Sequence, residues 1–344
     1  MNQPSNPLHH MLADLADDVR PVDLYQPAIR RSRQIGRRRT AAAGVSLAVV
    51  AVLGGGLWRL DPPTPQPVAA SIAGLPGTLF YRDDDTVVRL AVDTGPQTVA
   101  HTEAESRSAV SPDGTKVAVV GAKTGVVVSE DGRPRTLLAT TTPSGYGPSW
   151  SADGSTLFTA RRGPDGKPQP GLLNVADGTF SAVSVPPTAT DVLLSGDGRS
   201  VVYADDACRV TVAPVTGGAG RIVPVLGDDD RSVNPPGWSV CDIVAVSDDA
   251  TRAAVRLQVT DAAPELTDGT GADTIVDTAT GQVLVPPAEG SVSAALFGPG
   301  DSMLYRYEQE DAYTLVVQDS HGRVTARVEE PASVEGLTLV AYTR

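Results

Sequence analysis

The segment SPDGTKVAV at residues 111–119 decides the fold, because the chain repeats its pattern. SADGSTLFT at residues 151–159 and SGDGRSVVY at residues 195–203 share the same form: Ser-x-Asp-Gly, two further residues and an apolar strand. Looser copies begin at Ser247, Gly298 and Ser333, and successive copies lie 40, 44, 52, 51 and 35 residues apart. A repeat of about forty residues made of short strands is typical of one four-stranded propeller blade. The repeats therefore predict an all-β propeller.

The clear copies also predict turns, because an Asp-Gly pair favours a tight hairpin in which glycine takes a positive φ. We therefore interpret six residues as structural: Asp113, Gly114, Asp153, Gly154, Asp197 and Gly198. The sequence assigns no catalytic, cofactor-binding or metal-binding residue. Only His101 and His321 follow residue 59, and the chain lacks the Gly-x-Ser-x-Gly elbow of a serine hydrolase, so we do not expect an enzyme.

The two ends of the repeat region indicate how the ring closes. Residues 77–99 read as three strands that follow no Ser-x-Asp-Gly copy, and residues 337–342 read as a single strand at the C-terminus. If that last strand completes the first blade, the ring has six blades and both its ends are held. A seven-bladed ring is the alternative, and it requires a further blade within the 52- and 51-residue intervals.

The copy at residues 111–114, and the stretch PSWSADG at residues 148–154, resemble the S-P-D-G repeats of TolB-like, WD-repeat-like propellers with six blades. The resemblance covers about 270 residues, from residue 74 to the end of the sequence. It implies a six-bladed fold at residues 74–344, in which Trp150 packs between blades.

A stretch of nineteen residues without charge, at residues 40–58, precedes the repeats. As a helix it would span ~28 Å, close to the ~30 Å hydrocarbon core of a bilayer. Arginines cluster on its N-terminal side, so the positive-inside rule places residues 1–39 in the cytoplasm and the propeller outside. We predict a single transmembrane helix here. A buried helix of a soluble protein, a signal peptide cleaved after Ala70, and a twin-arginine signal at Arg38 and Arg39 are the alternatives.

The net charge also changes sign between residues 1–39 and the rest of the chain. The net charge of −13 combines +3 over residues 1–39, which hold seven Arg against four Asp, with −16 over the remainder. This acidity speaks against direct binding of nucleic acid. Residues 59–73 are rich in proline and predict an extended stalk beneath the propeller.

Residues 1–39, the predicted cytoplasmic tail, combine a stretch with helical apolar spacing and a cluster of arginines. Residues 8–19 carry apolar side chains at helical spacing, which predicts a short amphipathic helix, and arginines dominate residues 30–39. The tail resembles the start of membrane proteins of high-GC bacteria that are often encoded beside extracytoplasmic-function sigma factors. That resemblance implies that the tail holds a cytosolic sigma factor, as anti-sigma proteins do. Contact with anionic lipid is the alternative role.

The two cysteines, Cys208 and Cys241, fall in neighbouring predicted blades outside the cytoplasm, and we predict a disulfide between them; two buried free thiols are the alternative.

The complete prediction is a membrane-anchored extracytoplasmic scaffold or sensor that binds a protein, peptide or glycan on the propeller. The alternative is a propeller enzyme, of lactonase or glycan-processing type, with its site at the mouth of the channel. We expect acidic side chains that converge there to favour the enzyme, and a neutral or apolar face to favour binding.

Overall fold

The computed structural model describes residues 74–91, 94–103, 106–141, 146–225, 238–259, 271–288, 290–309 and 312–344. All of them belong to the second of two compact units of the chain, Pro65–Arg344. The predicted tail at residues 1–39, anchor at residues 40–58 and stalk at residues 59–73 lie outside the described residues. In the part of the chain that is described, no helix combines the length and apolarity needed to span a bilayer.

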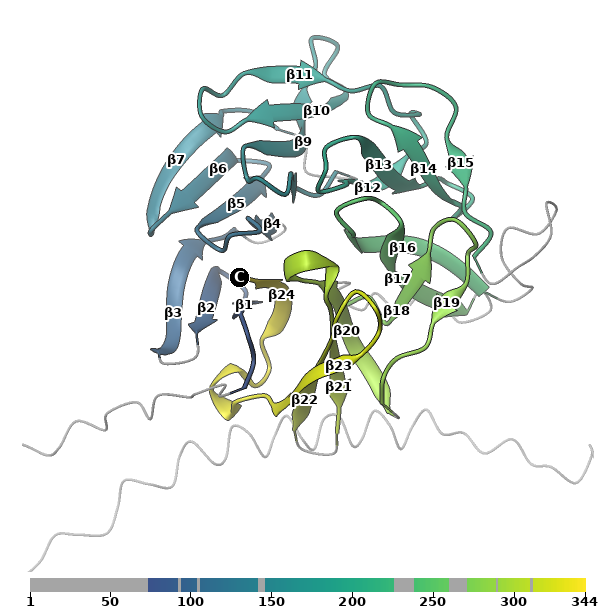
Figure 1. The fold of residues 1–344 in the computed structure, drawn as a ribbon. Helices are drawn as coiled ribbons and strands as arrows, with labels where there is room; N and C mark the ends of the chain where they lie inside the picture. The colour runs from purple at the N-terminus through teal and green to yellow at the C-terminus, as the bar shows by residue number, and fades with distance from the viewer. Residues whose placement is uncertain are drawn as a thin grey trace, which may run out of the picture. The chain divides into compact units, whose positions relative to one another are not determined.

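Six four-stranded antiparallel sheets surround a common centre, with the first strand of each sheet innermost (Figure 1). The prediction of six blades is confirmed. Blade 1 holds β24 (Thr338–Thr343), β1 (Thr78–Arg82), β2 (Thr86–Ala91) and β3 (Thr94–His101). Blade 2 holds β4 (Arg107–Val110), β5 (Lys116–Gly121), β6 (Gly125–Glu130) and β7 (Arg133–Leu138). Blade 3 holds β8 (Ser149–Trp150), β9 (Thr156–Arg162), β10 (Pro168–Asn174) and β11 (Phe180–Ala182).

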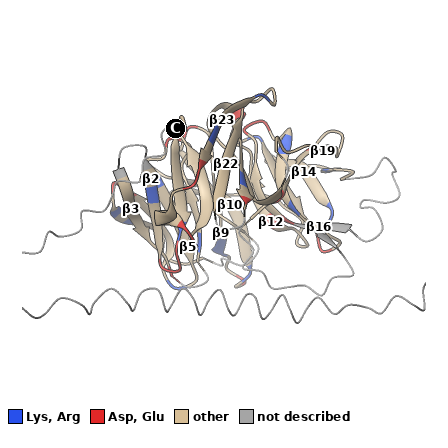
Figure 2. Ribbon diagram, turned by 90° about the horizontal axis from the view of Figure 1, so that it is seen from below, with Lys and Arg blue, Asp and Glu red and all other residues tan. Residues whose placement is uncertain are grey.

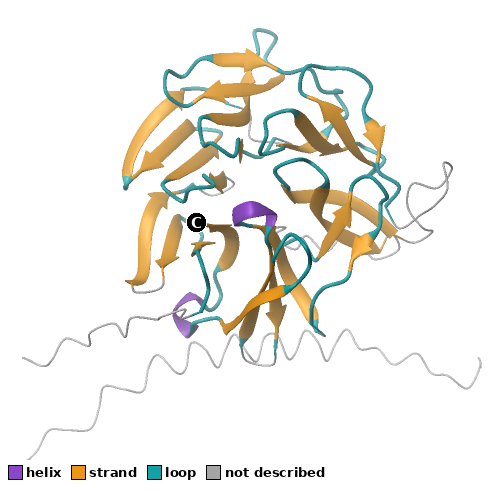
Figure 3. Ribbon diagram, in the orientation of Figure 1, coloured by secondary structure: helices purple, strands orange, loops and turns teal. Residues whose placement is uncertain are grey.

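Blades 4 to 6 continue in chain order. Blade 4 holds β12 (Thr190–Leu194), β13 (Ser200–Ala204), β14 (Val210–Pro214) and β15 (Arg221–Ile222). Blade 5 holds β16 (Trp238–Val246), β17 (Arg252–Val259), β18 (Thr274–Asp277) and β19 (Val283–Leu284). Blade 6 holds β20 (Ser291–Phe297), β21 (Met303–Glu308), β22 (Tyr313–Gln318) and β23 (Val324–Glu329). The helices among the described residues are two short 3₁₀ turns, η1 (Pro299–Asp301) and η2 (Ala332–Val334) (Figure 3).

The ring closes as the sequence predicted. The last strand, β24, pairs antiparallel with β1, so that Thr78 lies opposite Thr343 and Leu79 lies opposite Tyr342. Blade 1 is thus built from the two ends of the repeat region. Closure of this kind leaves only short strand edges exposed and couples the stability of the first strands to that of the last.

The middle strands of the blades are apolar on both faces because each blade packs between two neighbours. In β13, Val201 and Tyr203 join a core cluster with Phe158 of blade 3, while Val202 and Ala204 face the other way, into a cluster with residues of blade 5. Successive residues of a strand point to opposite faces, so one strand contributes to two cores. Figure 2 shows the corresponding pattern of charge, with Lys, Arg, Asp and Glu lying mainly in loops and near strand ends.

Trp150 packs against blade 2. Its side chain is buried in a cluster that contains Val126 and Val128, and its indole N–H donates a hydrogen bond of 3.1 Å to the carbonyl oxygen of Ala109. A buried indole of this kind needs such an acceptor, and the adjacent blade supplies it.

A buried ion pair in blade 6 is hydrogen-bonded to blade 1. Arg306 of β21 donates from Nε to Glu330 at 3.0 Å, and Tyr81 of β1 donates from its hydroxyl to the other oxygen of Glu330 at 2.9 Å. The guanidinium also donates to the carbonyl oxygen of Leu337 and stacks 3.7 Å from the centre of the Tyr313 ring. Arg306 and Glu330 expose only 8% and 1% of their side chains. This group, which we call the closure clamp, lies where the first and last blades meet.

Five repeat copies occupy equivalent turns, and the last copy does not. Those that begin at Ser111, Ser151, Ser195 and Ser247 connect the first and second strands of blades 2 to 5, and Gly298 begins the matching turn of blade 6 at η1. The copy at Ser333 lies in η2, before the innermost strand of blade 1. Blade 1 needs no such turn, because its first two strands come from opposite ends of the chain.

Candidate functional site

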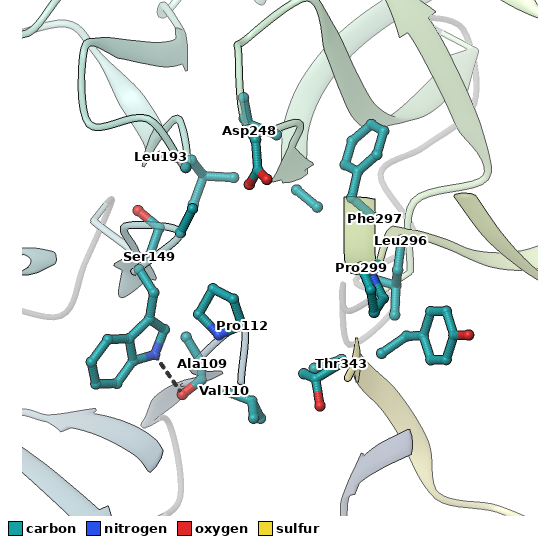
Figure 4. Close-up of a pocket in the computed structure, with 18 of the residues that line it drawn as sticks. Ala109, Val110, Pro112, Ser149, Leu193, Asp248, Leu296, Phe297, Pro299 and Thr343 are labelled. Atoms are coloured by element: carbon teal, nitrogen blue, oxygen red, sulfur yellow. Dashed lines mark hydrogen bonds between the residues drawn. The ribbon is translucent and has the colours of Figure 1, made fainter. Parts of the chain in front are cut away.

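A pocket of about 320 Å³ opens at the centre of the ring, on the face that carries the Ser-x-Asp-Gly turns (Figure 4). The innermost strand of every blade contributes to this mouth pocket. Its lining combines polar and charged groups, among them Ser149, Asp248 and Arg344, with apolar side chains, which are those of Ala109, Val110, Trp150, Leu193, Leu194, Val244, Val246, Leu296, Phe297, Val340 and Tyr342. A hollow in which apolar side chains surround placed polar groups is the usual form of a ligand site.

The repeat aspartates hold the turns around this rim. In blade 4, Ser195 donates to Asp197 at 2.6 Å, and Asp197 in turn accepts the backbone N–H of Arg199 at 3.0 Å. The same pattern places Asp113 and Asp153 in the turns of blades 2 and 3. Hydrogen bonds from Ser151 and Ser155 lower the pKa of Asp153, because they favour its charged form.

The pKa of Asp113 is also lowered, although burial opposes ionisation more strongly here than at Asp153. Burial opposes its ionisation, but hydrogen bonds from Ser111 and Thr115 outweigh this effect and lower its pKa. The paired glycine of each clear copy has a positive φ, at 70°, 64° and 71° for Gly114, Gly154 and Gly198. These carboxylates are therefore engaged in turn structure.

Hydrogen bonds also link each turn to the next around half of the rim. The N–H of Ala152 donates to the carbonyl oxygen of Gly196 at 2.6 Å, and the N–H of Asp197 donates to that of Asp248 at 2.7 Å. The N–H of Asp248 then donates to the carboxylate of Asp301 at 3.0 Å. The turns of blades 3 to 6 thus form one connected rim, which holds the mouth pocket in a defined shape.

Asp248 differs from the other rim aspartates. It occupies the second position of its copy, between Ser247 and Asp249, and its carboxylate points into the mouth pocket (Figure 4). Burial, followed by the negative charges of Asp301 and Asp249, raises its pKa, and Arg344 opposes this only in part. The rim therefore concentrates negative charge at one side of the mouth pocket.

The opposite ends of the innermost strands carry a different arrangement. Arg107 at the start of β4 reaches Asp191 at the start of β12, with 3.0 Å between the charged atoms. Asp191 has a positive φ of 47°, which is uncommon for a residue other than glycine. Burial raises its pKa even though Arg107 opposes the shift. Blade 3 lies between these two strands, and the ion pair bridges across it.

Sequence reasoning missed Asp248 as a residue of the site. The comparable positions of the three clear copies hold Pro112, Ala152 and Gly196, none of which is charged. A carboxylate at a position that is otherwise uncharged was the available signal. What the copies could not indicate is that this position faces the central pocket, because that depends on how the blades are arranged.

Among the described residues, no three His, Cys, Asp or Glu side chains gather in a way that could hold a metal ion. Cys208 is disulfide-bonded in the structure. It lies between β13 and β14 of blade 4, and Cys241 belongs to β16 of blade 5, where its side chain is outside the described residues. The pairing of these two cysteines stays a prediction.

Comparison with known proteins supports the fold. No family model and no curated protein matches the sequence. The chain is similar in structure to TolB from Acinetobacter baumannii, with a TM-score of 0.51 and 15% identity over 78% of this chain and 67% of that one. It also matches a structure assigned to TolB from Agrobacterium tumefaciens, with a TM-score of 0.43 and 13% identity over 68% of this chain and 85% of the other. The likeness is one of fold: an all-β, TolB-like propeller of six blades.

Proposed function

We propose that this protein is a membrane-anchored, extracytoplasmic scaffold or sensor that binds a protein, peptide or glycan at the mouth pocket. The observation that carries the proposal is the pocket itself. All six blades contribute apolar side chains and polar groups to one hollow, and hydrogen bonds between neighbouring turns hold much of its rim. A preformed hollow of this kind loses little conformational freedom on binding, which favours affinity.

Crosslinking in intact cells tests the binding role. A photo-reactive amino acid at Ala152, which is exposed on the rim of the pocket, should give a defined covalent adduct with the partner. The matched control is the same amino acid at Lys167, an exposed residue of the β9–β10 hairpin at the opposite end of the blade. Mass spectrometry then identifies the adduct. No adduct, or the same adducts from both positions, would contradict binding at the mouth pocket.

An enzyme is the second candidate. A lactonase or glycan-processing enzyme needs reactive groups that converge at the mouth of the channel, and the neighbouring carboxylates of Asp248 and Asp301 are the feature that favours it. Against it stand Asp113, Asp153 and Asp197, which are engaged in turns. We expect the purified chain to leave a panel of lactones and oligosaccharides unchanged. Turnover that disappears in Asp248→Asn would instead establish the enzyme.

The anchored arrangement rests on the sequence. Nineteen uncharged residues at 40–58 separate a tail with a charge of +3 from a remainder with a charge of −16, and the arginines lie on the side that the positive-inside rule assigns to the cytoplasm. Fusion to alkaline phosphatase, which is active only outside the cytoplasm, provides the test. We expect activity from a fusion after residue 344 and none from a fusion after residue 39. The reverse pattern would contradict this topology.

The tail supplies the signalling part of the proposal. Residues 1–39 are basic and contain one stretch with helical apolar spacing, which suits the docking of a cytosolic protein such as a sigma factor. Purification of the full chain from its host should recover the sigma factor, and purification of a chain that lacks residues 1–39 should not. If both chains recover it, or neither does, the tail does not hold it.

A further inference from the structure

The carboxylate of Asp248 faces the mouth pocket without a partner from the described residues. It accepts no hydrogen bond from them and forms no ion pair with them, although its own N–H and C=O are both hydrogen-bonded to neighbouring turns. The neighbouring Asp249 shows the contrast, since it accepts hydrogen bonds from Ser247 and from the hydroxyl and N–H of Thr251. The backbone of Asp248 therefore connects neighbouring turns of the rim, while its carboxylate has no hydrogen-bond partner among the described residues.

The surroundings of this carboxylate are closely fitted. A methyl group at Gly196 would overlap the carboxylate of Asp248, so the turn of blade 4 leaves room for it only because residue 196 is glycine. The turn of blade 6 places Asp301 beside it. The turns of two adjacent blades thus border the carboxylate at the side of the pocket, where Asp248 is exposed to solvent.

The charges around Asp248 are mostly of its own sign. Asp301, Asp249 and Asp197 all raise its pKa in addition to burial, and Arg344 is the basic residue that opposes them. A carboxylate among carboxylates is costly to keep ionised, and a cation placed beside it relieves that cost. Such an unfavourable arrangement at the edge of a cavity is a feature of binding sites.

We propose that the mouth pocket accepts a cationic group, an ammonium or guanidinium carried on an apolar stem, with the charge at Asp248 and the stem against the apolar side chains of the lining. This inference rests on the proposed function and specifies the ligand of the same site. Asp248 provides the counter-charge, and Val110, Leu193 and Phe297 border the remaining space (Figure 4). A lysine or arginine side chain of a partner protein has this chemistry, and so has a small free amine.

Three small probes that share a phenylalkyl stem and carry head groups of different charge test the chemistry directly. 4-Phenylbutylamine is the cation, 4-phenylbutanol the neutral analogue and 4-phenylbutanoate the anion, and each is titrated into the full chain at low salt by ligand-observed NMR. Because the full chain includes the predicted anchor, it is held in a detergent. The detergent must be nonionic, because a zwitterionic headgroup would itself supply an ammonium. We expect the amine to bind at least tenfold more tightly than the alcohol, and the anion to bind more weakly than both. Equal affinities of amine and alcohol would overturn the proposal.

Variants connect the preference to Asp248. Asp248→Asn should reduce the affinity of the amine to that of the alcohol and leave the alcohol unchanged. Gly196→Ala keeps the charge but displaces the carboxylate, and it should also weaken the amine. Glu308→Gln is the matched control, since Glu308 is an exposed carboxylate at the opposite end of β21. If Asp248→Asn binds the amine as the unaltered chain does, Asp248 is not the receptor; melting curves confirm that each variant is folded.

Two further arms separate this inference from the function on which it rests. If the crosslinked adduct at Ala152 forms undiminished in Asp248→Asn, the pocket binds a partner, but the proposal of a cationic ligand is wrong. An adduct that Asp248→Asn abolishes, together with a preference for the amine probe, supports both and identifies a basic group of a partner protein. Calcium chloride at millimolar concentration should not displace the amine. Displacement by calcium would replace the proposal with a metal site.

Discussion

The closure clamp links blade 6 to blade 1, and replacing Arg306 with methionine tests how much the ring depends on it. The substitution keeps a side chain of similar length but removes the guanidinium that Glu330 faces at 3.0 Å. Glu330 exposes 1% of its side chain and would then lie buried with only the hydroxyl of Tyr81 as a partner. Removing one member of a buried ion pair costs about 3–5 kcal/mol.

The expected loss is large for a single substitution. At about 2 °C per kcal/mol for a domain of this size, the melting temperature of Arg306→Met should fall by roughly 6–10 °C at pH 7.5. Differential scanning fluorimetry and denaturant titration of the full chain measure the change. The ion pair between Lys116 and Glu130 supplies the control. It is an exposed pair of opposite charges, with 60% of the Glu130 side chain accessible and 3.8 Å between the charged atoms. Glu130→Gln should cost at most about 1 kcal/mol.

The pH dependence distinguishes a lost ion pair from lost packing. Burial raises the pKa of Glu330, and Arg306 lowers it, so the pKa in Arg306→Met should rise further. An acid whose pKa is higher in the folded state than in the unfolded chain loses stability as pH rises through the unfolded value, about 4.3, and the loss is complete above the folded value. The deficit of Arg306→Met should therefore be largest near pH 8 and should shrink toward pH 5.

Two results would refute this reasoning. One is a deficit in Arg306→Met that is the same at pH 5 and pH 8, which would point to packing instead of charge. The other is a double variant, Arg306→Met with Glu330→Gln, that is at least as unstable as the sum of the single variants. We expect the double variant to recover part of the loss, because the unpaired buried charge is then gone.

Three further predictions concern the rim and the cysteines. Ser195→Ala should cost about 1–3 kcal/mol in denaturant titration, because the buried Ser195 hydroxyl accepts the N–H of Ser200; a change below about 0.5 kcal/mol would contradict its structural role. Burial and like charges raise the pKa of Asp248, so its ionisation destabilises the fold as pH rises above about 3.9. Asp248→Asn should then melt higher at pH 7.5, by at most about 2 °C because Asp248 is exposed, with the gain shrinking toward pH 4, and a lower melting temperature at pH 7.5 would contradict this. Non-reducing peptide mapping should recover Cys208 joined to Cys241, whereas two free thiols would disprove the pairing.

Much of the fold could be predicted because its turns depend on local chemistry. A serine, an aspartate two residues later and a glycine after that form hydrogen bonds within five residues, as at Ser195, and so they leave a visible repeat. The repeat indicated the strands that follow it and the number of blades. It failed at Ser333, which begins a loose copy, Ser-Val-Glu-Gly, but lies in η2, because sequence similarity does not reveal which strands a turn connects.

The site was less predictable than the fold. The turn aspartates were interpreted as structural from the sequence, but Asp248 stood inside a copy that looked merely degenerate. Its importance depends on a pocket to which the innermost strands of all six blades contribute. No local pattern encodes that pocket, because its walls come from strands that are far apart in the chain.

The sequence by itself determined the strands, the turns between them and a charge division of +3 and −16 about an uncharged stretch, since each of these follows from neighbouring residues. Only the tertiary structure decided which side chains meet. Tyr81 and Glu330 are 249 positions apart and still share a hydrogen bond, because the last strand completes the first blade. Asp248 and Asp301 are 53 positions apart and come together because blades 5 and 6 pack side by side and present their turns on the same face. Contacts of this range depend on the packing of whole blades, and a linear pattern cannot contain them.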